Sequence, residues 1–253
     1  MWDADIYNHY YKERSQPSVD LVHRISGKSF KRILDIGCGT GMSTAAIRAV
    51  WKDSEIIGVD LSAEMLERAR KDMPGITFIQ RDCSKSLADL GTFDLIFSNA
   101  FLQWISNQEE FMKNSFEMLS AGGKFAAQIP LFNTMSANQC INDSKRVLPE
   151  SFKSKNVEKC FSYSEKEYYD MISKLSDNIC MWVTDYFHEM DNHEAIIQFL
   201  SGTALRPYID GLYGAEQQIF LDEVLYHIEK SYPCQLNGKV LFPFKRLFLI
   251  GTK

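Results

Sequence analysis

The sequence predicts an α/β fold in which helices cover both faces of a mostly parallel sheet. Short apolar strand candidates alternate with helix candidates between residues 32 and 129. A glycine-rich turn follows the first strand candidate, and polar residues stand where successive strand candidates end. Parallel strands are joined by crossover helices that bury both sheet faces, which produces this alternation.

The N-terminal part, residues 1–30, has the amphipathic pattern of helices, with aromatic residues at Tyr7, Tyr10 and Tyr11. We expect two helices here, joined at residues 13–17. The second would begin at Pro17, because proline is favoured in the first turn of a helix.

The alternating part contains short strand candidates rich in β-branched residues, at 32–36, 55–60, 76–80, 93–98 and 123–129. Helix candidates lie at 43–51, 63–72 and 108–119. Ser43 and Thr44 offer an N-cap for the first of these helices, and Ser62 offers one for the second.

Beyond residue 130 the alternation ends. The polar and aromatic stretch 131–176 is expected to be helical, and helices are also expected at 192–201 and 214–231. We expect one domain over residues 1–253. Its parts are N-terminal helices (1–30), a core (31–130), helical cap regions (131–176 and 190–235) and C-terminal strands (about 179–187 and 240–250, the latter interrupted by Pro243).

Composition narrows the class of protein. The net charge of −5, from 33 acidic and 28 basic residues, argues against a nucleic-acid partner. No run of about 18 apolar residues indicates a membrane span, and the N-terminal residues lack a signal-peptide pattern. The six cysteines form no C-x-x-C pair and the histidines no H-x-x-x-H. We therefore expect a cytoplasmic protein with reduced thiols, no membrane partner and no metal.

The glycine turn has the pattern D-x-G-x-G-x-G, formed by Asp35, Gly37, Gly39 and Gly41. A strand, a glycine turn and a helix start make a place where backbone N–H groups converge on a ligand. The dinucleotide fingerprint G-x-G-x-x-G does not fit, because Met42 stands where its third glycine belongs. Asp35 would repel a pyrophosphate, and it would either attract a cationic ligand or orient the turn. So dense a glycine motif after a strand favours a ligand over an empty turn.

Polar residues end the following strand candidates. Asp60 lies about 20 residues beyond the glycine turn, where an acid holds ribose hydroxyls in this architecture. Asp82 and Asn99 end the next two strand candidates. Each alone could simply cap a helix. On successive strands beside a glycine turn, they favour an adenosine-containing ligand.

This constellation resembles motif I and the following strand ends of class I S-adenosylmethionine (SAM) dependent methyltransferases. The resemblance implies a Rossmann-like seven-stranded sheet with mixed direction at one edge, SAM as cofactor and S-adenosylhomocysteine as product. It also implies that Asp60 binds both ribose hydroxyls, Leu61 packs on adenine, Asp82 receives the adenine amino group and the Cys83 backbone reads the ring. The other residues placed beside SAM are Asp35, Gly37, Gly39, Gly41 and Asn99, with Arg14 a candidate for its carboxylate.

A closer resemblance, running from about residue 5 to the end, is to the trans-aconitate methyltransferases. It is strongest in residues 13–17, 98–104, 199–208 and 244–248, and weakest at 131–176. It implies a small carboxylic acid as methyl acceptor, with the cap regions forming a lid over it.

A carboxylate acceptor is already ionised at neutral pH, because its unperturbed pKa is about 4. It needs no general base, so we expect no catalytic residue beyond those that position the reactants. Arginine binds carboxylates bidentately, which makes Arg14, Arg206 and Arg246 candidates. Gln103, Trp104 and Tyr208 are expected to shape the pocket. The plain alternatives are structural ion pairs for the arginines and core packing for Trp104.

Three other functions remain open at this point. A malonyl-carrier-protein methyltransferase of biotin synthesis would share the fold and the SAM motifs, and would take an acyl carrier protein as partner. A nucleotide-dependent oxidoreductase is disfavoured by Met42. A non-catalytic SAM sensor would bind the cofactor without turning over any acceptor.

Overall fold

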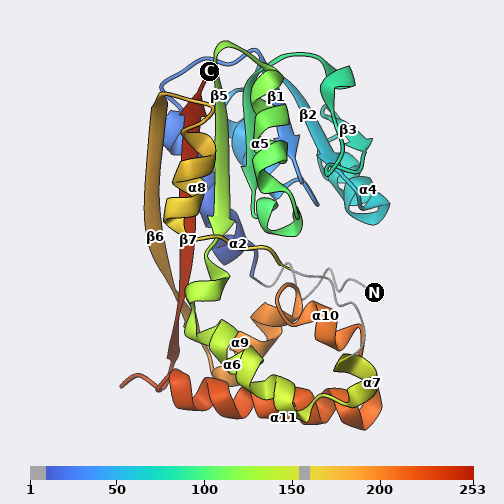
Figure 1. Ribbon diagram of the computed structural model, residues 1–253, viewed down its shortest axis with the longest axis vertical. Coiled ribbons are helices and arrows are strands. Elements are labelled where there is room, and N and C mark those ends of the chain that lie inside the picture. The colour runs from blue at the N-terminus through green and yellow to red at the C-terminus, as the bar shows by residue number, and fades with distance from the viewer. Residues whose placement is uncertain (1–9, 154–159) are drawn as a thin grey trace. The chain divides into compact units, whose positions relative to one another are not determined.

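The computed structural model describes residues 10–153 and 160–253. It contains a seven-stranded sheet in the order β3-β2-β1-β4-β5-β7-β6 (Figure 1). The strands are β1 (Arg32–Ile36), β2 (Glu55–Asp60), β3 (Thr77–Gln80), β4 (Phe93–Asn99), β5 (Leu119–Pro130), β6 (Asn178–Met190) and β7 (Val240–Thr252). The α/β class and the strand count are therefore confirmed.

The sheet changes direction at one edge, as expected. β1 pairs in parallel with β2 and β4, β2 with β3, and β4 with β5. β7 lies antiparallel to β5, from Lys124 opposite Thr252 to Pro130 opposite Arg246. The carboxyl ends of β1, β2, β4 and β5 consequently share one edge of the sheet.

The chain divides into two compact units, where the sequence predicted one domain. One unit, which we call the sheet unit, comprises Arg14–Pro130, Tyr163–Thr184 and Arg246–Lys253. Figure 1 shows α5 and α8 on the near face of its sheet. Its helices are α2 (Tyr11–Ile25, from Arg14 on), α3 (Met42–Val50), α4 (Ala63–Asp72), α5 (Gln108–Glu117) and α8 (Glu165–Ile172), with short 3₁₀ turns η1 (Ala88–Leu90) and η2 (Leu102–Trp104).

The expected joint at residues 13–17 is wrong, because α2 is a single helix with Pro17 inside it. Tertiary packing overrides the local cost of proline here: Leu21 and Val22 are almost fully buried. The Ser18 hydroxyl donates to the Ser15 carbonyl (2.7 Å), which gives a carbonyl beside the proline a side-chain partner. The first nine residues of the predicted N-terminal helices, Tyr7 included, lie outside the described residues.

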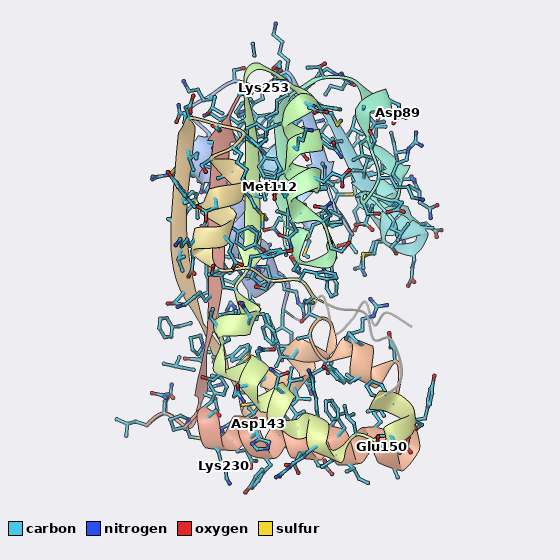
Figure 2. The ribbon with its side chains drawn as sticks, in the orientation of Figure 1. Asp89, Met112, Asp143, Glu150, Lys230 and Lys253 are labelled. Atoms are coloured by element: carbon cyan, nitrogen blue, oxygen red, sulfur yellow. The ribbon has the colours of Figure 1, made fainter. Side chains whose placement is uncertain are left out.

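The second, the helical unit, comprises residues 10–13, Leu131–Ser162 without residues 154–159, and Asp185–Lys245. Figure 2 labels Asp143 on α6 and Lys230 on α11, two helices that pack together. Buried aromatic rings centre on Phe199, which meets Tyr10, Phe242 and Phe244 at 5.2–5.8 Å between ring centroids. The helices are α6 (Ser136–Ser144), α7 (Glu150–Lys153), α9 (His193–Ser201), α10 (Arg206–Ile209) and α11 (Gly214–Ser231), with 3₁₀ turns η3 (Phe132–Thr134) and η4 (Lys145–Val147).

β7 runs through Pro243 without the expected interruption. The ladder between β7 and β5 begins only at Arg246, so the missing N–H of Pro243 removes none of its hydrogen bonds. Across the ranges that the structure describes, no helix is both long and apolar enough to cross a membrane.

Candidate active site

The glycine turn is held by the protein itself. Gly37 N and Cys38 N both donate to the Val59 carbonyl at the end of β2, and Gly39 N donates to Asp60 Oδ2 at 2.9 Å. Gly41 N donates to the Cys38 carbonyl. These four amides are therefore engaged within the fold, and convergence of backbone N–H groups on a ligand stays a prediction for the other amides of the turn. Three of the amides fix the turn to β2, and the Gly41 amide closes the turn on itself.

Glycine is required at Gly37 for two reasons. Its φ of +73° lies in the left-handed region, and a Cβ there would lie 2.3 Å from the ring of Phe101. Gly39 differs: outside the turn, the one atom of the described residues within 4 Å of a Cβ would be Met65 Sδ, at 3.5 Å. The face of Gly39 is thus open, whereas Phe101 covers Gly37. The sequence offered no signal that Phe101 would pack there.

Asp35 is completely buried under the glycine turn. Its Oδ2 accepts hydrogen bonds from the hydroxyls of Ser43 (2.7 Å) and Thr44 (2.6 Å). These two residues were expected to cap α3, and that expectation is wrong. The N-cap is Gly41, without a side-chain bond, because the buried carboxylate takes both hydroxyls.

Burial raises the pKa of Asp35 from 3.8 to about 6. The bonds from Thr44 and Ser43 oppose this shift, and the charge of Asp60 adds to it. Asp35 Oδ1 is buried and has no hydrogen-bond partner among the described residues. The neighbouring Cys38 thiol has a pKa raised by burial and by Asp35 and Asp60, which keeps it protonated. Cys38 thus fills space in the turn and is a poor nucleophile.

Asp60, at the end of β2, orients the turn and the start of α4 at once. Its Oδ2 accepts from Gly39 N and its Oδ1 from Ser62 N, both at 2.9 Å. A carboxylate has about four lone-pair positions, so two remain for hydroxyl donors. Leu61, next along, is a large apolar side chain that is 64% exposed. This pair presents a fixed carboxylate beside an open apolar surface.

Asp82 and Cys83 follow β3. Asp82 Oδ1 accepts from the backbone and hydroxyl of Ser84, and its Oδ2 lies 3.3 Å from Lys85 Nζ. The Ser84 hydroxyl is the main cause that lowers the pKa of Asp82, which keeps it an acceptor. Cys83 is buried beside the Gly37 backbone, and burial raises its pKa to about 12.

Past the end of β4, Ala100 is held in a left-handed conformation with φ +53°. Ala100 N donates to the Gln128 carbonyl, and Gln103 Nε2 donates to the Ala100 carbonyl at 2.6 Å. Asn99 Oδ1 and Gln103 Oε1 are buried, and neither has a hydrogen-bond partner in the described chain. A strained alanine and two buried acceptors without partners thus stand together at one strand end, a combination that is common at functional sites.

Gln128 of β5 is fully buried, and its Oε1 accepts from Arg246 Nη1 at 3.2 Å. Arg246, the β7 residue opposite Pro130 of β5, is itself 5% exposed. The sequence pointed to Arg246 but not to Gln128. The signal for Gln128 was present: it is a polar residue inside the apolar run 125–131.

Three further residues of the predicted site lie in the sheet unit. Arg14 of α2 and Gln103 of η2 are buried, at 7% and 8% exposure, and Trp104 of η2 is half-buried. A buried arginine is uncommon, since a desolvated charge is costly unless it is compensated.

Arg206 and Tyr208 belong to the helical unit. Arg206, at the start of α10, is partly exposed, and its Nε lies 3.2 Å from Asp210 Oδ2. The Tyr208 ring stacks on Phe220 (4.9 Å) and Phe152 (5.8 Å). Their predicted roles in substrate binding stay predictions.

A mixed sheet of this strand order, with a glycine turn after β1 and an acid ending β2, defines a class I SAM-dependent methyltransferase. The family described as "Methyltransferase domain" matches residues 33–123. A trans-aconitate 2-methyltransferase of Escherichia coli O1:K1 is 33% identical over 252 residues, covering all of this chain and 98% of that protein. The chain belongs to the trans-aconitate 2-methyltransferase family.

Solved structures share the fold at lower identity. The YcgJ protein from Bacillus subtilis is 17% identical with a TM-score of 0.64, covering 94% of this chain and 98% of that one. An O-methyltransferase from a multienzyme of Brevibacillus brevis, in complex with S-adenosylhomocysteine, is 14% identical with a TM-score of 0.55. It covers 95% of this chain and 72% of that one.

The residues at the strand ends fit SAM. SAM carries a sulfonium and an ammonium, and three of the buried atoms without partners, Asp35 Oδ1, Asn99 Oδ1 and Gln103 Oε1, are acceptors. An ammonium is a donor only, so it would complete such acceptors. The two lone-pair positions that remain on Asp60 suit the ribose hydroxyls, and exposed Leu61 suits an adenine face.

Proposed function

We propose that this protein transfers the methyl group of SAM to a carboxylate of a small organic acid, trans-aconitate or an acid of similar structure. The observation that carries the proposal is the buried guanidinium of Arg246 at the carboxyl ends of the strands, hydrogen-bonded to a buried amide. The full-length likeness to proteins named trans-aconitate 2-methyltransferase supports the choice of acid.

In this proposal Asp60 holds the ribose, Leu61 covers the adenine, and Asp82 with the Cys83 backbone receives its polar edge. Asn99, Gln103 and Asp35 hold the positively charged part of SAM, with the open face of Gly39 giving room for close approach. Arg14 is a partner for the methionine carboxylate. Bound SAM supplies an electrophilic methyl group on a sulfonium.

The chain's residues then align the acceptor, and no proton has to move. An ionised carboxylate attacks directly, so Arg246 contributes by orienting the acid and stabilising its charge in a site with little water. Trp104 shapes the same part of the sheet unit. The products are a methyl ester and S-adenosylhomocysteine. Arg206 and Tyr208 remain proposed acceptor residues, and a cytoplasmic location remains a prediction.

The test is methyl transfer from SAM with a radiolabelled methyl group to a panel of acceptors. The panel contains trans-aconitate, cis-aconitate, citrate, a monocarboxylic acid and a malonylated acyl carrier protein. We expect the fastest transfer to trans-aconitate or another polycarboxylic acid. Transfer only to the carrier protein, or to no acid, would contradict the proposal.

A further inference from the structure

The Gln128 side chain is a buried polar group that the SAM motifs do not use. It stands in β5 with none of its surface exposed, opposite Asn99 of β4 and Phe248 of β7. In parallel and antiparallel ladders alike, paired residues project to the same face of a sheet. Gln128 and Asn99 therefore face the same side, near the strand ends where ligands bind in open α/β sheets.

Arg246 determines which way the Gln128 amide points. A guanidinium can only donate, so the atom that meets Arg246 Nη1 at 3.2 Å must be the oxygen, Oε1. The amide nitrogen, Nε2, is then the other end of the group. It is buried and has no acceptor within residues 10–153 and 160–253. Two N–H donors are thus directed at a position where the described protein offers no acceptor.

The atoms around this position select the kind of ligand. The nitrogen of Gln128 requires an acceptor, and the neighbouring guanidinium favours one that carries negative charge. A carboxylate meets both conditions. The nearby orphan atoms, Asn99 Oδ1 and Gln103 Oε1, are acceptors, which would repel a carboxylate and attract the ammonium of SAM. The donors, Gln128 and Arg246, therefore lie on β5 and β7. The acceptors, Asn99 and Gln103, lie at the end of β4 and just after it.

We propose that the Gln128 amide and Arg246 form a subsite for a carboxylate of the acceptor that is not the one methylated. This inference rests on the proposed function and assigns two residues to a second carboxylate of its substrate. A carboxylate held by an amide and a guanidinium has its lone pairs stabilised by those donors, which makes it a poor nucleophile. The attacking carboxylate must be another one, so the substrate carries at least two.

The experiment is calorimetric titration of trans-aconitate into the protein saturated with S-adenosylhomocysteine. Gln128→Met removes the amide and keeps the length, and Gln128→Glu keeps the shape and adds a negative charge. We expect the Kd for trans-aconitate to rise at least tenfold in the first variant and further in the second. The Kd for S-adenosylhomocysteine should stay within twofold, which also verifies that each variant is folded.

Ser115→Ala is the matched control. It removes a buried hydroxyl whose recorded bond is to its own helix, at the Phe111 carbonyl, so it should bind trans-aconitate as the wild type does. A second readout is the ratio of affinities for trans-aconitate and for a monocarboxylic acid. We expect the Gln128 variants to reduce that ratio towards one, which a general loss of stability would not do.

The outcomes separate this inference from the proposed function. If wild type methylates polycarboxylic acids and both Gln128 variants bind trans-aconitate within threefold of it, the subsite is overturned and the function stands. If trans-aconitate binds in a Gln128-dependent way but no acid is methylated, the subsite stands and the function falls. If wild type neither binds nor methylates any polycarboxylic acid, both fall.

Discussion

The carboxyl ends of β1 and β2 carry one chemistry, and the carboxyl end of β5 with the β7 segment beside it carries the opposite. The first pair presents two carboxylates, Asp35 and Asp60, which bind hydroxyl and backbone N–H donors. The second pair presents Gln128 and Arg246, a buried amide donor and a guanidinium. A cationic cofactor suits the first region and an anionic acceptor the second. The difference teaches that side chains on different strands of one sheet can provide separate binding regions for two reactants of opposite charge. Neither region needs a group that carries a proton.

Asp60→Ala should have the largest effect, because it removes the acid proposed for the ribose together with the acceptor of the Gly39 and Ser62 amides. Losing charge-assisted hydrogen bonds of about 1.5–3 kcal/mol each predicts SAM affinity about 100-fold weaker or worse. Calorimetric titration with SAM measures it. Asp89→Asn, which removes an exposed ion pair with Arg81, is the control and should be neutral. Unchanged affinity in Asp60→Ala would remove Asp60 from the cofactor region.

Arg246→Met tests the second region, in which Gln128 and Arg246 are proposed to bind the acceptor. Removing a buried guanidinium that orients a carboxylate should raise the acceptor KM about 10- to 100-fold, and SAM affinity should change by less than about twofold. Arg246→Lys tests geometry, since lysine keeps the charge but loses the planar fork. Steady-state kinetics with each substrate varied separates the two. Equal losses for SAM and acceptor would mean that the two regions are not sorted as described.

Asp35 gives the cofactor region a pH dependence. With a pKa near 6, Asp35 is largely protonated at pH 5 and ionised at pH 7. A bound cation favours the ionised form, so SAM affinity should rise about tenfold between these pH values and level off above them. Asp35→Asn should lose this dependence. A pH profile of SAM affinity that is the same in wild type and Asp35→Asn would separate Asp35 from the cofactor.

The same raised pKa affects stability with a definite sign. Between pH 3.8 and about 6 the folded protein holds a proton on Asp35 that the unfolded chain has released. The free energy of unfolding therefore falls as pH rises through this range, by up to about 3 kcal/mol from this group. Chemical denaturation at pH 4.5 and 7, compared with Asp35→Asn, measures this contribution.

Ala100→Gly should have the smallest effect. A left-handed alanine costs on the order of 1 kcal/mol, part of which is offset by the entropy that glycine adds to the unfolded chain. We expect unfolding free energy to rise by less than about 1 kcal/mol, with SAM affinity unchanged. A clear loss of SAM affinity would instead show that the strained residue positions Asn99.

Periodicity and turn chemistry predicted most elements, because strands buried on both faces and amphipathic helices leave strong local patterns. β1, β2 and α4 match their expected ranges, as does α11. What failed depends on tertiary contacts. Pro17 lies inside a helix because packing outweighs propensity, and Ser43 and Thr44 serve a carboxylate that is eight and nine residues away in sequence.

Some residues of the candidate site could be predicted from the sequence, and others depend on tertiary contacts. Asp35, Asp60 and the glycines were readable because they form a contiguous motif or end a predicted strand. Gln128 was not, because its partner Arg246 is 118 residues away and only the antiparallel pairing of β5 with β7 brings them together. The roles of the Gly37, Cys38 and Gly39 amides were also hidden, since their acceptors lie on β2.

The position of β7 between β5 and β6 has a consequence for synthesis. It is the last of the seven strands to leave the ribosome, yet it occupies an interior place in the sheet. The nascent chain can assemble β1, β2 and β4 while β7 is still being made, so an immature protein could recognise the methyl donor well before it can recognise an acid. Ligand binding during translation would then favour the donor, and selectivity for the acceptor would be acquired in the final step of folding.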